Sequence, residues 1–247
     1  MRPKVLVVRS GGRPFFSGEG PQNLEVRERV SHSIVPCLKG EGALDRRADM
    51  AIFTSQVAAE RLLGDSDLAA RLKNAIAAGQ IAAVGIATAD TLARYGIPAR
   101  EIGEGSARSL LDRLPADLSG QRILLPRGED ASTALEEELR RRGAVVDPVV
   151  LYRKVPRPRD ADLAVEIVRE PFAAFCVTAT SAARWLFADV GQNARDRLRA
   201  TPAVALGPST RRFLLGQSVS KVEVPDTVNF TEAARLLESL AVDGVRT

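Results

Sequence analysis

Histidine, cysteine and aromatic residues are scarce in this 247-residue sequence, and their scarcity excludes several kinds of chemistry. The one histidine, His32, lies in the alternating stretch RVSHSIVP, and no G-x-S-x-G motif accompanies it. Neither a Ser-His-Asp triad nor a zinc cluster is therefore indicated. Cys37 and Cys176 are far apart, lack C-x-x-C spacing and stand beside apolar residues. This context predicts two small buried side chains rather than a disulfide or a metal site.

Long apolar runs are also missing, which bears on membranes and secretion. No run approaches the roughly 18 residues that a membrane span needs, and the N-terminal apolar run Val5–Val8 is too short for a signal peptide. We therefore expect a cytoplasmic protein that does not associate with membranes.

The charge pattern and the missing phosphate motifs limit the choice of ligand. Aromatic residues make up only 4% of the chain and do not alternate with a basic patch, so nucleic-acid binding is not indicated. Neither G-x-x-x-x-G-K-[ST] nor G-x-G-x-x-G is present, so no nucleotide cofactor is implied. The formal net charge of +4 would suit a small polyanionic ligand.

Strand-like and helix-like stretches alternate along most of the chain. Apolar runs such as KVLVV and FAAFCVT are typical of buried strands, and SDLAARLKNAIAAG and STALEEELRRRG have the spacing and end signals of helices. This alternation predicts an α/β fold of parallel sheets covered by helices on both faces.

Three strand-end motifs occur twice, in the same order and at nearly constant spacing. IFTSQVAAERLL resembles VTATSAARWLF, VGIATADTL resembles LGPSTRRFL, and VLVVRSG resembles ILLPRGE. The repetition indicates an internal duplication and hence two similar α/β domains. The matched positions are Thr54 with Thr178, Gly85 with Gly207, and Arg9 with Arg127.

Hydroxyl and glycine residues mark four junctions at which a predicted strand enters a helix. Parallel sheets bind ligands outside the carboxyl ends of their strands, where helix N-termini offer free N–H groups to anions. The hydroxyls could instead only cap their helices, which is worth about 1 kcal/mol each. Four such junctions on repeated domains favour a binding site for carboxylates or phosphates. The junctions lie at Thr54, Gly85, Thr178 and Gly207.

Taken in order, several stretches resemble uroporphyrinogen-III synthase, the tetrapyrrole-pathway enzyme that closes hydroxymethylbilane. The resemblance extends from about Ala48 to Leu240, and the order and spacing of the motifs make it specific. The stretches are IFTSQVAAE, AAVGIATADTLARYGI, ILLPRGEDASTALEEELRRRGAVVDPVVLYRKVP and AVALGPSTRRFL.

The resemblance implies two similar domains, each a parallel sheet flanked by helices, joined by two extended connections with a cleft between them. One domain would consist of residues 1–38 and 154–247, and the other of residues 39–153. The crossings are expected near IVPCLKG and VVLYRKVP.

The same resemblance implies the reaction. Enzymes of this family are cofactor-independent lyases of haem and porphyrin biosynthesis, and they cyclise hydroxymethylbilane to uroporphyrinogen III with loss of water and inversion of ring D. No metal is implied. We expect a monomer that receives its substrate from hydroxymethylbilane synthase.

Family positions also imply the site residues. Tyr152, in VVLYRKVP, matches the family tyrosine that faces the cleft, with a role as general acid or hydrogen-bond donor to the leaving hydroxyl. From the residues alone, a strand tyrosine that packs by its ring remains an alternative. The expected substrate-binding residues are Arg9, Thr54, Ser55, Gly85, Thr88, Arg127, Thr178, Thr180, Ser181, Gly207, Ser209 and Thr210.

Two features of the sequence depart from the family pattern. Residues 10–38 lack the expected helix-Gly-strand pattern, which predicts a mobile loop over the cleft or a divergent first helix. Gln56 and Ala179 stand where the family often has proline.

Two other functions stay open. They are a non-catalytic two-domain protein that closes on a small polyanion, and a domain that senses a tetrapyrrole.

Overall fold

Contacts within the chain divide the protein into two compact units. The computed structural model describes residues 2–11, 14–16, 23–158, 161–188, 190–227 and 229–243. The first unit comprises Met1–Ser33 and Val155–Thr247, and the second comprises Ile34–Lys154. Among the described residues, no helix combines the length and apolar character needed to cross a membrane.

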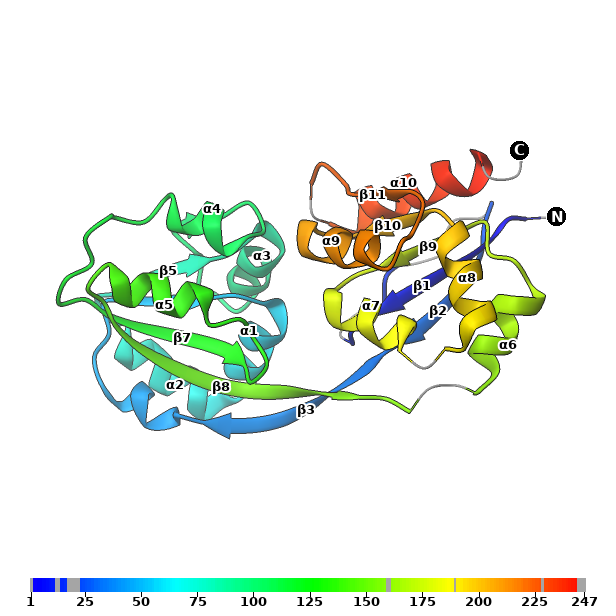
Figure 1. Ribbon diagram of the computed structural model, residues 1–247. Coiled ribbons are helices and arrows are strands. Elements are labelled where there is room, and N and C mark those ends of the chain that lie inside the picture. Colours follow the sequence, from blue (N-terminus) through cyan, green and yellow to red (C-terminus); the bar gives the residue numbers. More distant parts are fainter. Residues whose placement is uncertain are drawn as a thin grey trace. The chain divides into compact units, whose positions relative to one another are not determined.

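A five-stranded sheet in the order β11-β10-β9-β1-β2 forms the centre of the first unit (Figure 1). Its strands pair in parallel throughout, as βα connections require. The elements of this unit are β1 (Lys4–Arg9), β2 (Glu25–Val30), α6 (Ala161–Arg169), β9 (Ala174–Val177), α7 (Thr180–Phe187), α8 (Gln192–Ala200), β10 (Ala203–Ala205), α9 (Pro208–Gly216), β11 (Val222–Glu223) and α10 (Phe230–Asp243).

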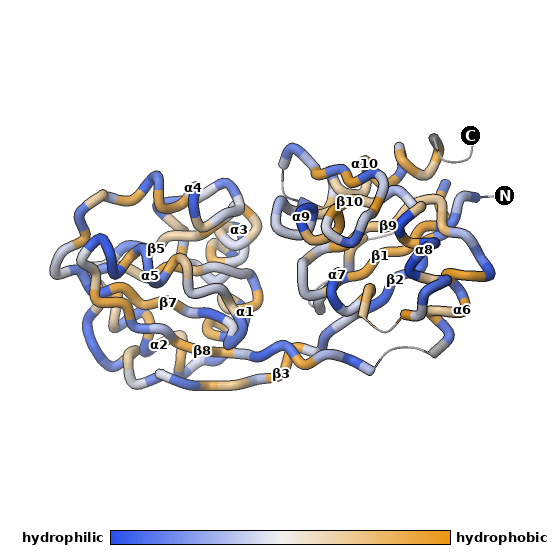
Figure 2. Tube along the Cα trace, viewed as in Figure 1, coloured by the Kyte–Doolittle hydropathy of each residue, from blue (hydrophilic) through white to orange (hydrophobic). Residues whose placement is uncertain are grey.

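Both faces of this sheet are buried because its central strands contain continuous apolar runs, Val5–Val8 in β1 and Ala174–Val177 in β9. On β1, Leu6 and Val8 pack into a cluster with residues of α6, α7, α8 and α9, whereas Val5 and Val7 pack toward α10 on the opposite face. Figure 2 shows the apolar residues concentrated along β1 and β9. A continuous apolar run thus became a central parallel strand, as predicted.

The second unit repeats this plan with a six-stranded sheet in the order β3-β8-β7-β4-β5-β6, in which β3 is His32–Lys39 and β8 is Val145–Pro156. Strands β8, β7, β4, β5 and β6 pair in parallel. The elements are η1 (Glu41–Asp45), β4 (Met50–Phe53), α1 (Gln56–Leu63), α2 (Ser66–Ala75), β5 (Gln80–Ala83), α3 (Ile86–Arg94), β6 (Glu101–Ile102), α4 (Ala107–Leu111), β7 (Arg122–Gly128) and α5 (Ala134–Arg141).

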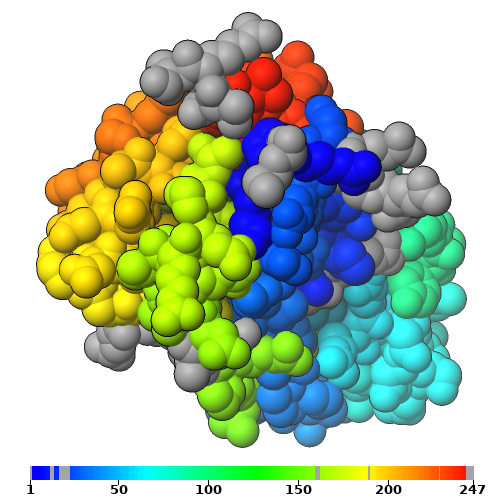
Figure 3. All heavy atoms as spheres, turned by 90° about the vertical axis from the view of Figure 1, so that its right-hand side faces the viewer, coloured from blue at the N-terminus to red at the C-terminus, as the bar shows by residue number. Residues whose placement is uncertain are grey.

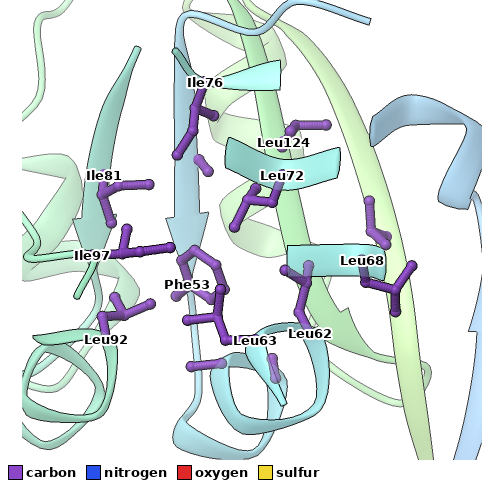
Figure 4. Packing of buried hydrophobic residues seen from close by; sticks show 14 of the residues in the cluster. Phe53, Leu62, Leu63, Leu68, Leu72, Ile76, Ile81, Leu92, Ile97 and Leu124 are labelled. Atoms are coloured by element: carbon purple, nitrogen blue, oxygen red, sulfur yellow. The ribbon is translucent and has the colours of Figure 1, made fainter. Parts of the chain in front are cut away.

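Phe53, at the carboxyl end of β4, anchors one core face of the second unit. Its side chain is fully buried in the cluster that η1, α1, α2 and α3 cover. In Figure 4 its ring lies among Leu62 and Leu63 of α1 and Leu92 of α3. The opposite face, with Ile52 of β4, is covered by α4 and α5.

The chain passes between the two units inside the neighbouring strands β3 (His32–Lys39) and β8 (Val145–Pro156). The fold class predicted from the sequence is confirmed, with two predominantly parallel sheets flanked by helices and joined by extended segments. The first crossing falls after Ser33, so residues 34–38 belong to the second unit rather than to the first. They do so because β3 forms the edge of the second sheet.

The two units share one internal topology, which supports the duplication inferred from the sequence. In the first unit β11-β10-β9-β1-β2 follows the same order as β6-β5-β4-β7-β8 in the second. The N-cap residues of α3 and α9 have nearly the same backbone angles, φ −161° and ψ 166° at Gly85 and φ −160° and ψ 167° at Gly207. The paired junctions therefore present their helix N-termini in the same way.

The described residues of the N-terminal segment 10–38 form strands and no helix, so they do not contain the divergent first helix that was one of the two expectations. The strands are β2 and β3, and Phe15 is buried with its ring centroid 4.9 Å from that of Phe230 on α10. Arg29 of β2 binds Glu166 of α6 at 2.8 Å, where the two segments lie side by side in Figure 3. Residues 12–13 and 17–22, which the predicted loop includes, lie outside the described residues.

Neither cysteine forms a disulfide, and the side chains of Cys37, Cys176 and His32 differ in burial. Cys176 is fully buried on β9, and this burial raises the pKa of its thiol, so the prediction for this residue is confirmed. Cys37 is only half-buried, and both cysteines are free thiols. The Nδ1 atom of His32, a buried side chain, lies 2.8 Å from Ser31 Oγ.

Candidate functional site

A register shift between β7 and β8 orients Tyr152. Arg127 pairs with Val150, but the next residue of β7, Gly128, pairs with Tyr152, so Leu151 is an extra residue in β8. Strict alternation from Val146, which packs toward α5, would place Tyr152 on that same face. The bulge instead turns Tyr152 into the cluster covered by α1 and α3, where it is 5% exposed.

The Tyr152 hydroxyl reaches the N-terminus of α1. It lies 3.2 Å from Ser55 Oγ, and Ser55 Oγ accepts a hydrogen bond from Ala58 N at 3.1 Å. Ser55 is the N-cap residue, with the extended backbone that caps adopt. The structure therefore brings together two predicted site residues, Tyr152 from β8 and Ser55 from the β4–α1 junction. Thr54, which precedes Ser55 at the same junction, is half-buried.

The first junction of this unit, β4–α1, and the second, β5–α3, are linked by a hydrogen bond that the sequence does not indicate. Gln56 Nε2 donates to Ala87 O at 2.9 Å, which links the first turn of α1 to that of α3. At the second junction, a Cβ on Gly85 would lie 3.0 Å from Gly105 Cα, so a side chain there would press on the neighbouring loop. The position of Gln56, where the family often has proline, does not by itself indicate this contact.

In the first unit, the corresponding junctions also bring hydroxyls together. Thr180 Oγ1 on α7 lies 3.3 Å from Thr210 Oγ1 on α9. Ser181 Oγ, in the first turn of α7, is buried and has no hydrogen-bond partner among the residues that the structure describes. A buried hydroxyl without a partner costs free energy, and the predicted role of Ser181 in substrate binding stays a prediction. Thr178, at the end of β9, is half-buried.

Glycine N-caps leave backbone N–H groups available at α3 and α9. Neither Gly85 nor Gly207 has a side chain to satisfy the first-turn amides, and a Cβ at Gly207 would meet nothing within 4 Å. Thr88 and Thr210 are buried in the first turns of these helices, whereas Ser209 is exposed. Each terminus therefore combines free donors with the positive end of a helix dipole.

The two predicted arginines are held by partners within their own units. Arg127 is 6% exposed, and its Nη1 binds Glu136 Oε2 at 2.7 Å while its Nη2 donates to Ala131 O. Arg9 donates from Nε to Glu28 on β2. These contacts give both guanidinium groups a structural role, and their role as carboxylate ligands stays a prediction.

Each unit thus presents two helix N-termini with nearby hydroxyls at the carboxyl end of its sheet. The termini belong to α1 and α3 in the second unit and to α7 and α9 in the first. Amide donors and helix dipoles of this kind bind carboxylates. Only the second unit adds a phenol, Tyr152, whose hydroxyl can donate a hydrogen bond or a proton.

Known proteins share both the sequence pattern and the fold. Residues 34–233 match the family of uroporphyrinogen-III synthase HemD. The Bacillus subtilis (strain 168) protein YjjA, which is described as uncharacterized, is 28% identical over 150 residues. That match covers 58% of this chain and 56% of YjjA, so the chain spans about half the length of this relative.

Solved structures of uroporphyrinogen III synthases have the same fold. A mutant of the Thermus thermophilus enzyme aligns with a TM-score of 0.66 and 20% identity over 97% of this chain and 99% of that one. The Helicobacter pylori 26695 protein aligns with a TM-score of 0.61 and 17% identity, covering 97% of this chain and 100% of its own. With the family match extending over most of its length, the chain belongs to the uroporphyrinogen-III synthase family.

Proposed function

We propose that this protein cyclises hydroxymethylbilane to uroporphyrinogen III, with inversion of ring D and loss of water. The observation that carries the proposal is the contact of 3.2 Å between the Tyr152 hydroxyl and Ser55 Oγ, at a helix N-terminus, in a chain of this family. The reaction needs neither a metal nor a cofactor, because the substrate supplies the electrons for each step.

Tyr152 assists the first step. Its hydroxyl donates to the hydroxyl that leaves ring A, the C–O bond breaks, and water departs to give an azafulvene. The substituted carbon of ring D then attacks, and the resulting spiro intermediate fragments and closes again with ring D reversed. The proton that ring D loses on closure balances the proton used to release water. A positioned acid of this kind contributes about 10²- to 10⁴-fold in rate.

The helix N-termini hold the substrate carboxylates. Gly85 and Gly207 leave backbone donors uncovered, and Ser181 Oγ has a free hydrogen-bonding capacity among the described residues. Binding of several carboxylates restrains the bilane to a curled conformation, which favours reaction at the substituted carbon over direct closure to isomer I. Preorganised dipoles also stabilise charge that develops as the hydroxyl leaves.

An isomer assay tests the proposed function. Purified protein is incubated with freshly prepared hydroxymethylbilane, the products are oxidised, and the porphyrin isomers are separated. We expect isomer III in excess over the isomer I that forms spontaneously. Binding of hydroxymethylbilane without any change in isomer ratio would contradict catalysis and would favour a non-catalytic protein that binds a polyanion.

Ser55→Ala separates the capping role of Ser55 from its contact with Tyr152. We expect a loss of about 1 kcal/mol in the free energy of unfolding, because α1 loses its cap, and a turnover lower by about tenfold, because the phenol loses a hydrogen-bond partner. Urea unfolding and the isomer assay measure the two effects.

Ser106→Ala is the matched control. Ser106 caps α4 through the same kind of bond, with Oγ accepting from Ser109 N at 3.1 Å, and the hydrogen bonds of its side chain among the described residues are with Ser109 rather than with Tyr152. It should therefore lower stability and leave turnover unchanged. Equal turnover in the two variants would show that the Ser55 hydroxyl serves only as a cap.

A further inference from the structure

Gly128 lies directly against the ring of Tyr152. An added Cβ at Gly128 would come within 2.8 Å of Tyr152 Cε2 and Cζ and within 3.0 Å of its hydroxyl oxygen. Real side chains do not approach this closely, so the ring can occupy its observed place only if residue 128 has no side chain. The backbone of Gly128 is not in the left-handed region, so close approach, rather than an unusual φ, explains the glycine.

The bulge and the glycine act together on Tyr152. The extra residue Leu151 turns the tyrosine toward α1, and the bare backbone of Gly128 leaves room for its ring at the end of β7. The two strands are also joined beyond the bulge, where Glu129 N donates to Tyr152 O at 2.8 Å. The hydroxyl then reaches Ser55 Oγ.

We propose that Gly128 is a positioning residue for the reaction, and that it acts through the placement of the Tyr152 hydroxyl. This inference rests on the proposed function, in which that hydroxyl assists the departure of water. Gly128 touches no reacting atom itself.

The loop around Gly128 is fixed, so the ring has to yield when a methyl group is added. Arg127 Nε donates to Gly128 O at 3.2 Å, and the same guanidinium donates to Ala131 O and binds Glu136. A side chain at residue 128 would therefore push the phenol rather than the strand. A displacement of about 1 Å in a catalytic group can cost about a hundredfold in rate.

Gly128→Ala, Tyr152→Phe and the double variant form the decisive cycle. We expect Gly128→Ala alone to lower kcat for isomer III by about ten- to a hundredfold while KM changes by less than about twofold. Tyr152→Phe keeps the ring but lacks the hydroxyl, so adding Gly128→Ala to it should lower the residual rate by less than about threefold. If the double variant loses as much rate as the product of the two single-variant losses, the proposal is overturned. Such a result would mean that Gly128→Ala causes a general structural defect, which acts with or without the Tyr152 hydroxyl.

Gly42→Ala is the matched control, since a Cβ at Gly42, also in the second unit, would meet nothing within 4 Å. It should leave kcat unchanged. If the wild-type protein makes no isomer III, the proposed function fails by itself, and the placement of the ring is then judged from a readout that needs no activity.

That readout is the nuclear magnetic resonance spectrum of protein with labelled tyrosine rings. The chain has only two tyrosines, and Tyr152→Phe assigns their signals. Gly128→Ala should shift the Tyr152 signal and leave the Tyr95 signal in place, and an unmoved Tyr152 signal would overturn the inference. If Gly128→Ala does not fold, adding Tyr152→Ala should restore folding, and failure to do so would equally count against contact with the ring.

Discussion

Tyr152→Phe should fold as the wild type does and lose about 10²- to 10⁴-fold in the rate of isomer III formation. The fold should survive because the Tyr152 ring is buried in the cluster under α1, and phenylalanine fills the same volume. Ser55 Oγ would still accept from Ala58 N, so α1 keeps its cap. The measurement is the isomer assay, corrected for spontaneous isomer I, with urea unfolding in parallel.

The loss should fall mainly on kcat, because the hydroxyl acts on a group that leaves in the transition state. Tyr95→Phe is the control, since Tyr95 is the other tyrosine, is 39% exposed and ends α3 in the same unit. Tyr95→Phe should have wild-type kinetics. Normal turnover in Tyr152→Phe would remove the phenol hydroxyl from the mechanism and leave only the packing of its ring.

Glu136→Ala is expected to lower the free energy of unfolding by about 3–5 kcal/mol, because it leaves a buried guanidinium without its carboxylate. Arg127 and Glu136 are 6% and 8% exposed, and their atoms Nη1 and Oε2 are 2.7 Å apart. Charges that are this well shielded from water depend on each other far more than exposed pairs do. Urea unfolding at neutral pH measures the change.

Glu137→Ala supplies the comparison on the same helix. Glu137 is exposed, and its carboxylate accepts a hydrogen bond from Thr133 Oγ1 at 2.6 Å, so its removal should cost well under 1 kcal/mol. A loss as small as this for Glu136→Ala would show that Arg127 does not need its partner. The predicted role of Arg127 as a ligand for a substrate carboxylate would then gain support.

Several features could be predicted from the sequence because they depend on local pattern. The apolar run of β1 and the helical spacing before Gly143 gave the right elements, because burial on two faces and a C-terminal glycine leave clear signals. The repeated junctions indicated two similar units, and the structure gives those units the same strand order. Ser55 could be predicted for the same reason, since a hydroxyl before a helix is a local capping signal.

The strand β2 was missed because its signal is weak. Glu25–Val30 has valine only at positions 26 and 30 and charged residues at the others, and its arginines make ion pairs with α6 that the sequence does not reveal. As an edge strand it needs charge rather than a continuous apolar run. Arg127 is a similar case, because only the folded chain shows that its guanidinium meets Glu136 in a buried pair.

By itself, the sequence determined the succession of strands and helices, the duplication and the hydroxyl-bearing junctions, because each of these is encoded within a few neighbouring residues. Only the tertiary structure decided which way Tyr152 points. Alternation along β8 would turn that side chain toward α5, and the register shift opposite Gly128 turns it toward Ser55. Pairing between β7 and β8 is a property of two separated segments, so no local pattern in either strand contains it.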